Sequence, residues 1–267
     1  MGIKKIAIIS LFILLAGVAV SIILNVKDAL VNKSDEIIVE DNSFTNIHIL
    51  SDNALVEIIP TKNEATKAKF SGKMKKKSNY NFHADVKGDT LVVELKEKRW
   101  SFIQFGLTSH DIKLKVYVPE QNYSKLKTEI DNGRIVAENM NVKNMELETD
   151  NGSIELKNIN SESVFTKTDN GQILMDNVEG KLKAETDNGR IVLITNNLER
   201  SIDFKADNGL LQIQTDKEPS NATIQAKVDV GSVHIFGKTK TRTIFGDGVN
   251  LINLEIDNGK IIVKKSY

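Results

Sequence analysis

Asp131-Asn132-Gly133 is the first of six Asp-Asn-Gly triplets that decide the fold of this chain. The other five triplets are Asp150-Asn151-Gly152, Asp169-Asn170-Gly171, Asp187-Asn188-Gly189, Asp207-Asn208-Gly209 and Asp257-Asn258-Gly259. A degenerate copy, Asp229-Val230-Gly231, precedes the last of them. From one glycine to the next the steps are 19, 19, 18, 20, 22 and 28 residues. A repeat of about 20 residues is typical of stacked structural units.

Apolar residues recur at alternate positions on both sides of each triplet. The column two residues after the glycine contains Ile135, Ile154, Ile173, Ile191, Leu211, Val233 and Ile261. Similar columns, mostly apolar or Thr, lie one, three and five residues before the aspartate. Residues two apart lie on one face of a strand, so each unit is predicted to be a strand, a corner and a second strand with one apolar face.

Seven units that each expose one apolar face can bury it by stacking on one another. We therefore expect an all-β fold, a parallel β-solenoid (β-helix) of about 20-residue repeats, in which the Asn-Gly step lets the corner adopt a positive φ. Asn-Gly is also a strong hairpin signal, so an antiparallel meander is the alternative. The matching residue types in each column favour the parallel arrangement.

The N-terminal segment has the length and composition of a membrane anchor. Residues 6–26 carry no charge and follow Lys4 and Lys5, which predicts one bilayer-spanning helix with a cytoplasmic N-terminus. A cleaved signal peptide, with Gly17-Val18-Ala19 as the cleavage site, is the alternative. We expect an anchor at residues 1–27, a linker at 28–35, a less regular β cap or stem at 36–119 and the solenoid at 120–267. The bulk of the chain would then be extracytoplasmic, on the cell membrane.

Two further segments match a known family pattern. Val116-Tyr117-Val118-Pro119 and Tyr123-Ser124-Lys125-Leu126, followed by repeated T-x-N-G-x-I units, resemble the DUF4097 "putative adhesin" family of bacterial envelope proteins. The short anchor is similar to that of its LiaG-like members. The resemblance implies a β-helical extracytoplasmic domain, linked in some relatives to envelope stress. It implies no catalytic or binding residue.

The sequence contains no recognisable catalytic, cofactor or metal motif. The 36 basic and 36 acidic residues cancel, which gives no indication of nucleic-acid binding, and the absence of cysteine excludes thiolate chemistry. The four histidines have no ligand spacing. Stacked aspartates of the triplets would bring together oxygen ligands suited to a hard cation, although Asp also favours turns by bonding to nearby backbone. Stacked asparagines would form an amide ladder.

Residues 61–99 form a basic segment, with 11 Lys and Arg against five Asp and Glu. Its candidate polyanion-binding residues are Lys73, Lys75, Lys76 and Lys77. A solvated strand face, on which lysines prevent edge-to-edge pairing, is the alternative.

These features predict a non-catalytic, membrane-anchored scaffold or binding module of the cell envelope. Its partners would be the membrane, through residues 6–26, and a cell-wall polymer or another envelope protein, with no nucleic acid and no cofactor. One alternative is a regulatory accessory of a membrane protein or sensor. A second is a carbohydrate-active enzyme, because β-helices often carry such activities, although that argument rests on fold analogy alone.

Overall fold

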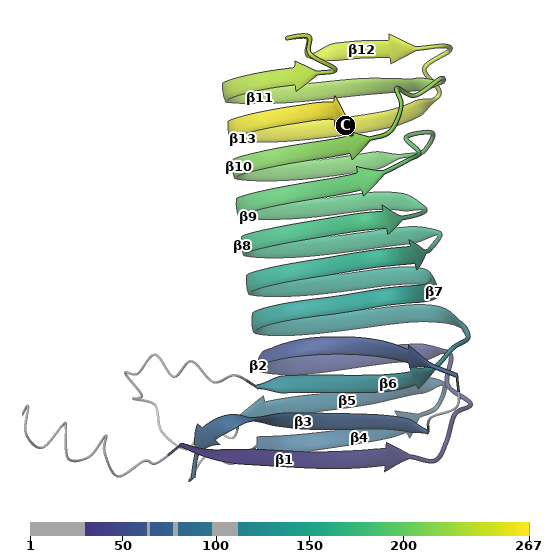
Figure 1. The fold of residues 1–267 in the computed structure, drawn as a ribbon, viewed down its shortest axis with the longest axis vertical. Coiled ribbons are helices and arrows are strands. Elements are labelled where there is room, and N and C mark those ends of the chain that lie inside the picture. The colour runs from purple at the N-terminus through teal and green to yellow at the C-terminus, as the bar shows by residue number, and fades with distance from the viewer. Residues whose placement is uncertain (1–29, 63–64, 77–79, 98–111, 267) are drawn as a thin grey trace, which may run out of the picture.

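The computed structural model describes residues 30–62, 65–76, 80–97 and 112–266, except for the side chain of Lys75. Within these ranges the chain forms strands and no α-helix (Figure 1). Accordingly, no described helix has the length and apolar character needed to cross a membrane. The predicted span at residues 6–26 lies outside the described ranges.

The strands belong to one sheet system of 13 strands. They are β1 (Leu30–Val39), β2 (Asn46–Thr61), β3 (Thr66–Lys75), β4 (Tyr80–Lys87), β5 (Thr90–Glu97), β6 (Lys113–Pro119), β7 (Asn122–Asn160), β8 (Ser163–Val178), β9 (Lys181–Thr195), β10 (Ile202–Thr215), β11 (Ala222–Ile235), β12 (Arg242–Phe245) and β13 (Asn250–Lys265).

Each repeat is a strand that bends at its triplet and pairs in parallel with the next repeat. Gly152 pairs with Gly171, Gly171 with Gly189, and Gly189 with Gly209, so the corners are in register. β7 contains two successive triplets and makes two turns by itself. The result is a coil of stacked rungs, drawn as a column in Figure 1. The repeats therefore pair in parallel and do not form the antiparallel meander.

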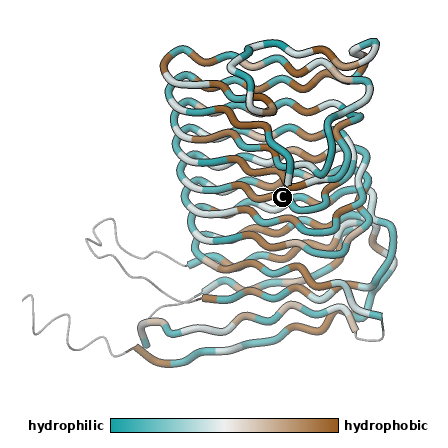
Figure 2. Tube along the Cα trace, turned by 45° about the horizontal axis from the view of Figure 1, so that its top comes forward, coloured by the Kyte–Doolittle hydropathy of each residue, from teal (hydrophilic) through white to brown (hydrophobic). Residues whose placement is uncertain are grey.

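The core lies inside the coil, between the strand halves on either side of the corner. The column that follows each glycine is buried at every rung, and Ile135, Ile154 and Ile173 are completely inaccessible to solvent. Figure 2 shows the apolar positions alternating with polar ones along every strand, as the two-residue period predicts. Threonines fill part of the core near the corners, including Thr149, Thr168 and Thr186.

Glycine is required at the corners because each rung approaches the previous one through its backbone. Gly171 has a φ of 153°, and a Cβ at this position would lie 1.7 Å from the carbonyl oxygen of Gly152. Ala54 occupies the same register opposite Gly133, but its φ is not positive. This exception occurs where the stack begins. On the other side of β2, β5 pairs with residues 46–51 and β6 with residues 55–61, so no corner stacks against Ala54 there.

The spatial order of the rungs differs from their order in the chain. β13, the last strand, is inserted between β10 and β11 and pairs in parallel with both. In space, the rung of the last triplet therefore precedes the rung of the Asp229 copy, although it follows it in the sequence. The long 28-residue step contains β12, which pairs antiparallel with β11 and covers that end of the coil.

Two columns of side chains explain why β13 occupies this position. The Asn258 side chain donates to Asn208 (3.2 Å), whereas stacking in chain order would place Val230 against Asn208. Glu255 likewise lies between Lys205 (4.0 Å) and Lys227 (2.6 Å), which chain order would place next to each other. Insertion therefore replaces a broken amide ladder and a like-charge contact with favourable pairs.

Antiparallel strands cover the N-terminal end of the coil. β3 pairs with β6, β1 with β3, and β4 with β5, all antiparallel. The regular stack already begins at β2, whose Asn53 pairs with Asn132. The first rung is thus formed inside the stretch, residues 36–119, that the sequence pattern assigned to the cap.

Engineered disulfides would test the position of β13, because the natural chain has no cysteine. Leu210 and Lys260 are register partners on adjacent rungs, whereas Leu210 and Ser232 are separated by the β13 rung. Adjacent strands lie about 4.8 Å apart and a disulfide tolerates Cα separations up to about 7 Å. We expect Leu210→Cys/Lys260→Cys to oxidise intramolecularly and Leu210→Cys/Ser232→Cys to stay reduced under the same conditions. The reverse pattern on non-reducing gels would show that the rungs stack in chain order.

Replacing a corner glycine would test the backbone contact. Gly171→Ala should lower the free energy of unfolding by roughly 3–5 kcal/mol, because backbone must move and a left-handed φ is strained. Gly237→Ala is the control, since Gly237 also has a positive φ of 77° but no atom within 4 Å of its Cβ position. It should cost only about 1–2 kcal/mol. Equal losses for the two variants in chemical denaturation would contradict the contact.

Candidate functional site

The triplet asparagines form one continuous ladder along an edge of the coil. From the second asparagine onward, each side-chain Nδ2 donates to the Oδ1 of the previous asparagine over 2.8–3.2 Å, in the order Asn53, Asn132, Asn151, Asn170, Asn188, Asn208 and Asn258. The ladder ends at Asn258, because Val230 occupies the next position and is 66% exposed. The amide ladder holds the corners of neighbouring rungs in register.

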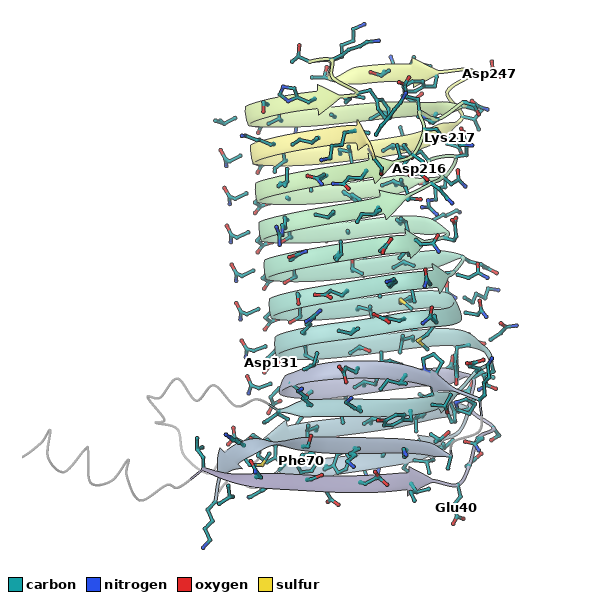
Figure 3. All side chains as sticks on the ribbon, viewed as in Figure 1. Glu40, Phe70, Asp131, Asp216, Lys217 and Asp247 are labelled. Atoms are coloured by element: carbon teal, nitrogen blue, oxygen red, sulfur yellow. The ribbon has the colours of Figure 1, made fainter. Side chains whose placement is uncertain are left out.

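The triplet aspartates lie beside this ladder and point outward, as Figure 3 shows for Asp131. Asp131, Asp150, Asp187, Asp207 and Asp257 are exposed, and Asp169 is partly exposed. Within the described part of the chain, no group of three His, Cys, Asp or Glu residues is arranged to hold a metal ion. These side chains occupy the corner positions, where Asp favours turns.

A second asparagine column was missed in the sequence pattern. Asn139, Asn158 and Asn177 adopt positive φ values of 56°, 52° and 53° at the opposite bend of the coil. Their amides also form a ladder, with Asn158 donating to Asn139 (2.9 Å) and Asn177 to Asn158 (3.0 Å). Asn tolerates this backbone region better than most residues. Each lies six residues after a triplet glycine, so a search for the same period outside the triplets would have found them.

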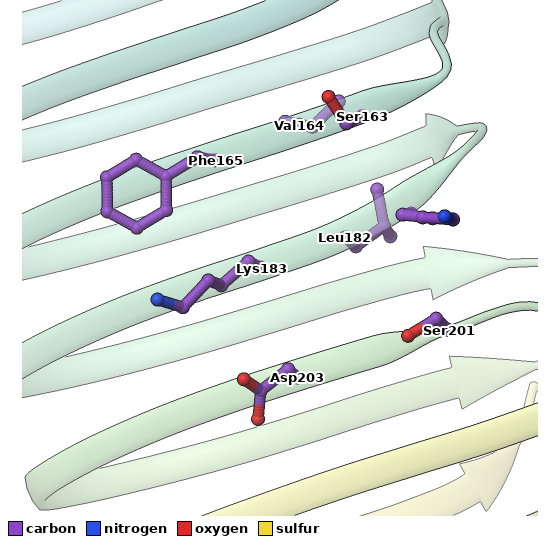
Figure 4. Close-up of a pocket in the computed structure, with 8 residues that line it drawn as sticks. Ser163, Val164, Phe165, Leu182, Lys183, Ser201 and Asp203 are labelled. Carbon is purple, nitrogen blue, oxygen red and sulfur yellow. The ribbon is translucent and has the colours of Figure 1, made fainter.

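The candidate site is a shallow groove of about 510 Å³ on the outer face of β8, β9 and β10. It is lined by Ser163, Val164, Phe165, Lys181, Leu182, Lys183, Ser201 and Asp203. Register pairing places Phe165, Lys183 and Asp203 in one outward column across three rungs, as Figure 4 shows. The sequence comparison of like positions could not reveal this site, because its three rungs carry three different residue types.

The groove combines one aromatic surface with polar groups. Phe165 is half-buried, and the Lys183 ammonium lies 5.2 Å from the centre of its ring, within cation–π range. Asp203 and Ser201 supply further polar atoms at the same groove. A flat apolar ring with flanking hydrogen-bond groups suits a ligand that has one apolar face and a polar rim, such as a sugar ring. Glycoside hydrolysis usually needs two carboxylates, and Asp203 is the only one that lines this groove.

A network of ion pairs continues the same outer face toward β2. Glu146 contacts Lys125 (2.7 Å) and Lys127 (3.0 Å), and Glu129 contacts Lys127 (3.3 Å) and His48 (3.0 Å). The hydrogen bond from Lys125 lowers the pKa of Glu146; burial opposes this shift, and Lys127 adds to it. Burial alone would raise the pKa of Glu129, but hydrogen bonds from His48 and Lys127 outweigh it and lower the pKa.

This network predicts a specific acid sensitivity. The pKa of Glu146 is lower in the folded chain than its ordinary value of 4.5, so its ionised form stabilises the fold above that value. The contribution is lost as the pH falls through the folded pKa. Glu146→Gln should therefore flatten the decline in unfolding free energy below about pH 4.5.

The control for this experiment is Glu162→Gln, because the Glu162 carboxylate makes a longer contact of 3.7 Å with Lys143 and is 69% exposed. Urea denaturation of the three proteins across the acid range measures the effect. Identical pH profiles for Glu146→Gln and the natural chain would show that the ion pairs do not stabilise the fold.

The four lysines proposed for polyanion binding are only partly described. Lys73 and Lys76 are exposed, at the end of β3 and in the turn that follows. The side chain of Lys75 and the whole of Lys77 lie outside the described residues.

Comparison with family models matches residues 44–173 and 124–263 to the family described as Toastrack DUF4097. No curated protein matches the chain. Similar solved structures include a "putative cell adhesion protein" from Clostridium sporogenes ATCC 15579, with 16% identity, a TM-score of 0.45 and coverage of 88% of this chain and 100% of that one. Another is a "putative adhesin" from Parabacteroides distasonis ATCC 8503, with 13% identity, a TM-score of 0.39 and coverage of 88% and 97%.

Proposed function

This chain belongs to the Toastrack DUF4097 family, and on this basis we propose that it is a non-catalytic, extracytoplasmic scaffold of the bacterial cell envelope that is anchored in the membrane. The groove at Phe165 is the observation that carries the binding part of this proposal. It offers an aromatic ring beside polar side chains on a face built from parallel rungs. Such a surface holds a polymer from the side without enclosing it.

The absence of catalytic geometry at the groove supports a binding role. The groove is shallow and open, so water has access to anything that is bound there. Asp203 is the single carboxylate in the groove lining, whereas glycoside hydrolysis usually uses two. Cell-wall glycan strands offer sugar rings at regular intervals, and they are the class of ligand that fits this chemistry best.

The membrane anchor belongs to the same proposal. Residues 6–26 are uncharged and long enough to cross a bilayer, and two lysines precede them. The first described strand begins only four residues after this segment, at Leu30. A short connection of this kind would keep the coil at the outer surface of the membrane, where the glycan layer begins. A role in envelope stress, which the family resemblance implies, fits this location.

Contact with a protein partner, as a regulatory accessory of a membrane protein, is a second candidate. It is favoured by apolar side chains that are exposed at the far end of the coil. Ile244, Val249 and Leu251 are 53%, 72% and 49% exposed. Ile244 of β12 and Leu251 of β13 both pair with Thr223 of β11, and Val249 directly precedes β13.

Binding to purified cell-wall sacculi tests the proposed function. Residues 28–267 should sediment with sacculi, and the supernatant should contain no released sugar fragments. Phe165→Ala should weaken binding roughly 3- to 10-fold, the range expected for loss of one aromatic contact. Leu174→Ala is the matched control, because Leu174 is a half-buried outward residue of β8 away from the groove.

Three outcomes would contradict parts of the proposal. Release of sugar fragments would show a carbohydrate-active enzyme. Equal weakening by Phe165→Ala and Leu174→Ala would remove the groove as the binding site. Failure of the natural chain to sediment would transfer the search to protein partners at the far end of the coil.

A further inference from the structure

A group of lysines that are distant in sequence lies on one outer face of the N-terminal cap. On β3 and β6, the side chains at alternate positions point into the core, and Ala68, Phe70 and Leu114 are buried there. The intervening positions therefore face outward, and register pairing places them side by side on neighbouring strands. We call this surface the lysine face; its residues are Lys67, Lys69, Lys73, Lys113 and Lys115.

The carboxylates that face these lysines are fewer than the lysines. Glu36 of β1 lies 3.7 Å from Lys69, and Glu57 of β2 lies 3.0 Å from Lys115. The Lys67 ammonium lies 4.7 Å from the centre of the Tyr117 ring. Lys73 and Lys113 are exposed, and no carboxylate of the described residues lies within ion-pair distance of either. Among the described residues, the ammonium groups of Lys69, Lys73, Lys113 and Lys115 thus share two carboxylates, which leaves the surface positive.

The opposite outer face of the cap is electrically balanced. It is formed by the outward residues of β4 and β5, which pair antiparallel. The negative charges of Asp85 and Glu94 balance the positive charges of Lys87 and Lys96 on this face. The Glu94 carboxylate lies 3.8 Å from the Lys96 ammonium. The positive charge of the cap is therefore one-sided, a property that the count of charges over residues 61–99 does not reveal.

The lysine face is also close to the point where the chain enters the cap. β1 is the outermost strand in Figure 1 and begins at Leu30. Leu30 pairs with Lys75 and Asn32 with Lys73, so the first residues of β1 border the lysine face. Leu30 and Ile38 are exposed by 56% and 61% and lie on the same outward side of β1. Four extended residues span about 14 Å, which limits the distance from the end of residues 6–26 to Leu30.

From this placement we propose that the lysine face docks on the anionic phospholipid headgroups of the bilayer that holds residues 6–26. The proposal rests on the membrane anchor of the proposed function. Lysines close to an anionic leaflet are attracted to its phosphates, and Leu30 and Ile38 provide apolar contacts at the interface. The face runs parallel to the stacking direction of the rungs, so docking tilts the coil toward the membrane and one side of the rod faces the glycan layer.

Single labels on the two faces of the cap would test this proposal, because the natural chain has no cysteine. Ser34→Cys lies on the outward side of β1 beside the lysine face, and Asn81→Cys lies on the opposite face, on β4; both positions are exposed. The full chain carrying one fluorophore would be reconstituted in phosphatidylcholine vesicles with or without phosphatidylglycerol. A quencher on the lipid headgroups then reports which face lies against the bilayer.

We expect stronger quenching at position 34 than at position 81 in the vesicles that contain phosphatidylglycerol, and loss of this difference at high salt. Lys73→Gln/Lys113→Gln should abolish the difference. Lys260→Gln/Lys264→Gln is the matched control, because it removes the same charge from outward positions of β13 and should leave the difference intact. Circular dichroism would verify that both double variants are folded.

Equal quenching at the two positions in anionic vesicles would overturn the docking proposal while leaving the anchor intact. Loss of the chain from vesicles after an alkaline wash would instead overturn the anchor, and the docking proposal with it. Lysine-dependent binding of a soluble phosphodiester polymer, combined with equal quenching at the two positions, would assign the lysine face to an envelope polymer and not to lipid.

Discussion

The close backbone contact between successive corner glycines is the constraint on which the stack depends. At each corner a Cβ would meet the carbonyl oxygen of the rung before it, at 1.7 Å for Gly171. Only a residue without a side chain lets the rungs approach to the spacing that their hydrogen bonds require. With the corners fixed, the strand halves on both sides enter register, and the apolar columns meet inside the coil.

Register alone does not decide which rungs are neighbours, because every corner has nearly the same shape. The side chains around the corner make that choice. Asn258 completes an amide ladder with Asn208, and Glu255 separates two lysines, so β13 fits between β10 and β11 better than at the end. Val230, which cannot continue the ladder, lies where the ladder stops. β12 then covers the last full rung with antiparallel pairing, which limits the length of exposed sheet edge.

The sequence was sufficient to predict the all-β class, the corner residues and the buried columns, because these depend on local period and residue size. It was insufficient wherever neighbours in space differ from neighbours in the repeat. The position of β13 required a comparison of Glu255 with both Lys205 and Lys227. The groove was missed because Phe165, Lys183 and Asp203 share a column without sharing a residue type. The lysine face was missed because Lys73 lies beside residues of β1 and Lys69 beside Lys115, whereas the basic run was taken as consecutive residues.

The insertion of β13 also affects the order in which the rungs of the coil can assemble. During synthesis, which starts at the N-terminus, the rungs from β2 to β10 can stack in chain order. β11 and β12 reach their final positions only after β13, which is synthesised later. Until β13 is synthesised, β10 and β11 each present an unpaired parallel edge. A chain cut short near its C-terminus therefore loses an internal rung instead of a terminal one. The coil is thus closed between β10 and β11 only when β13 is present.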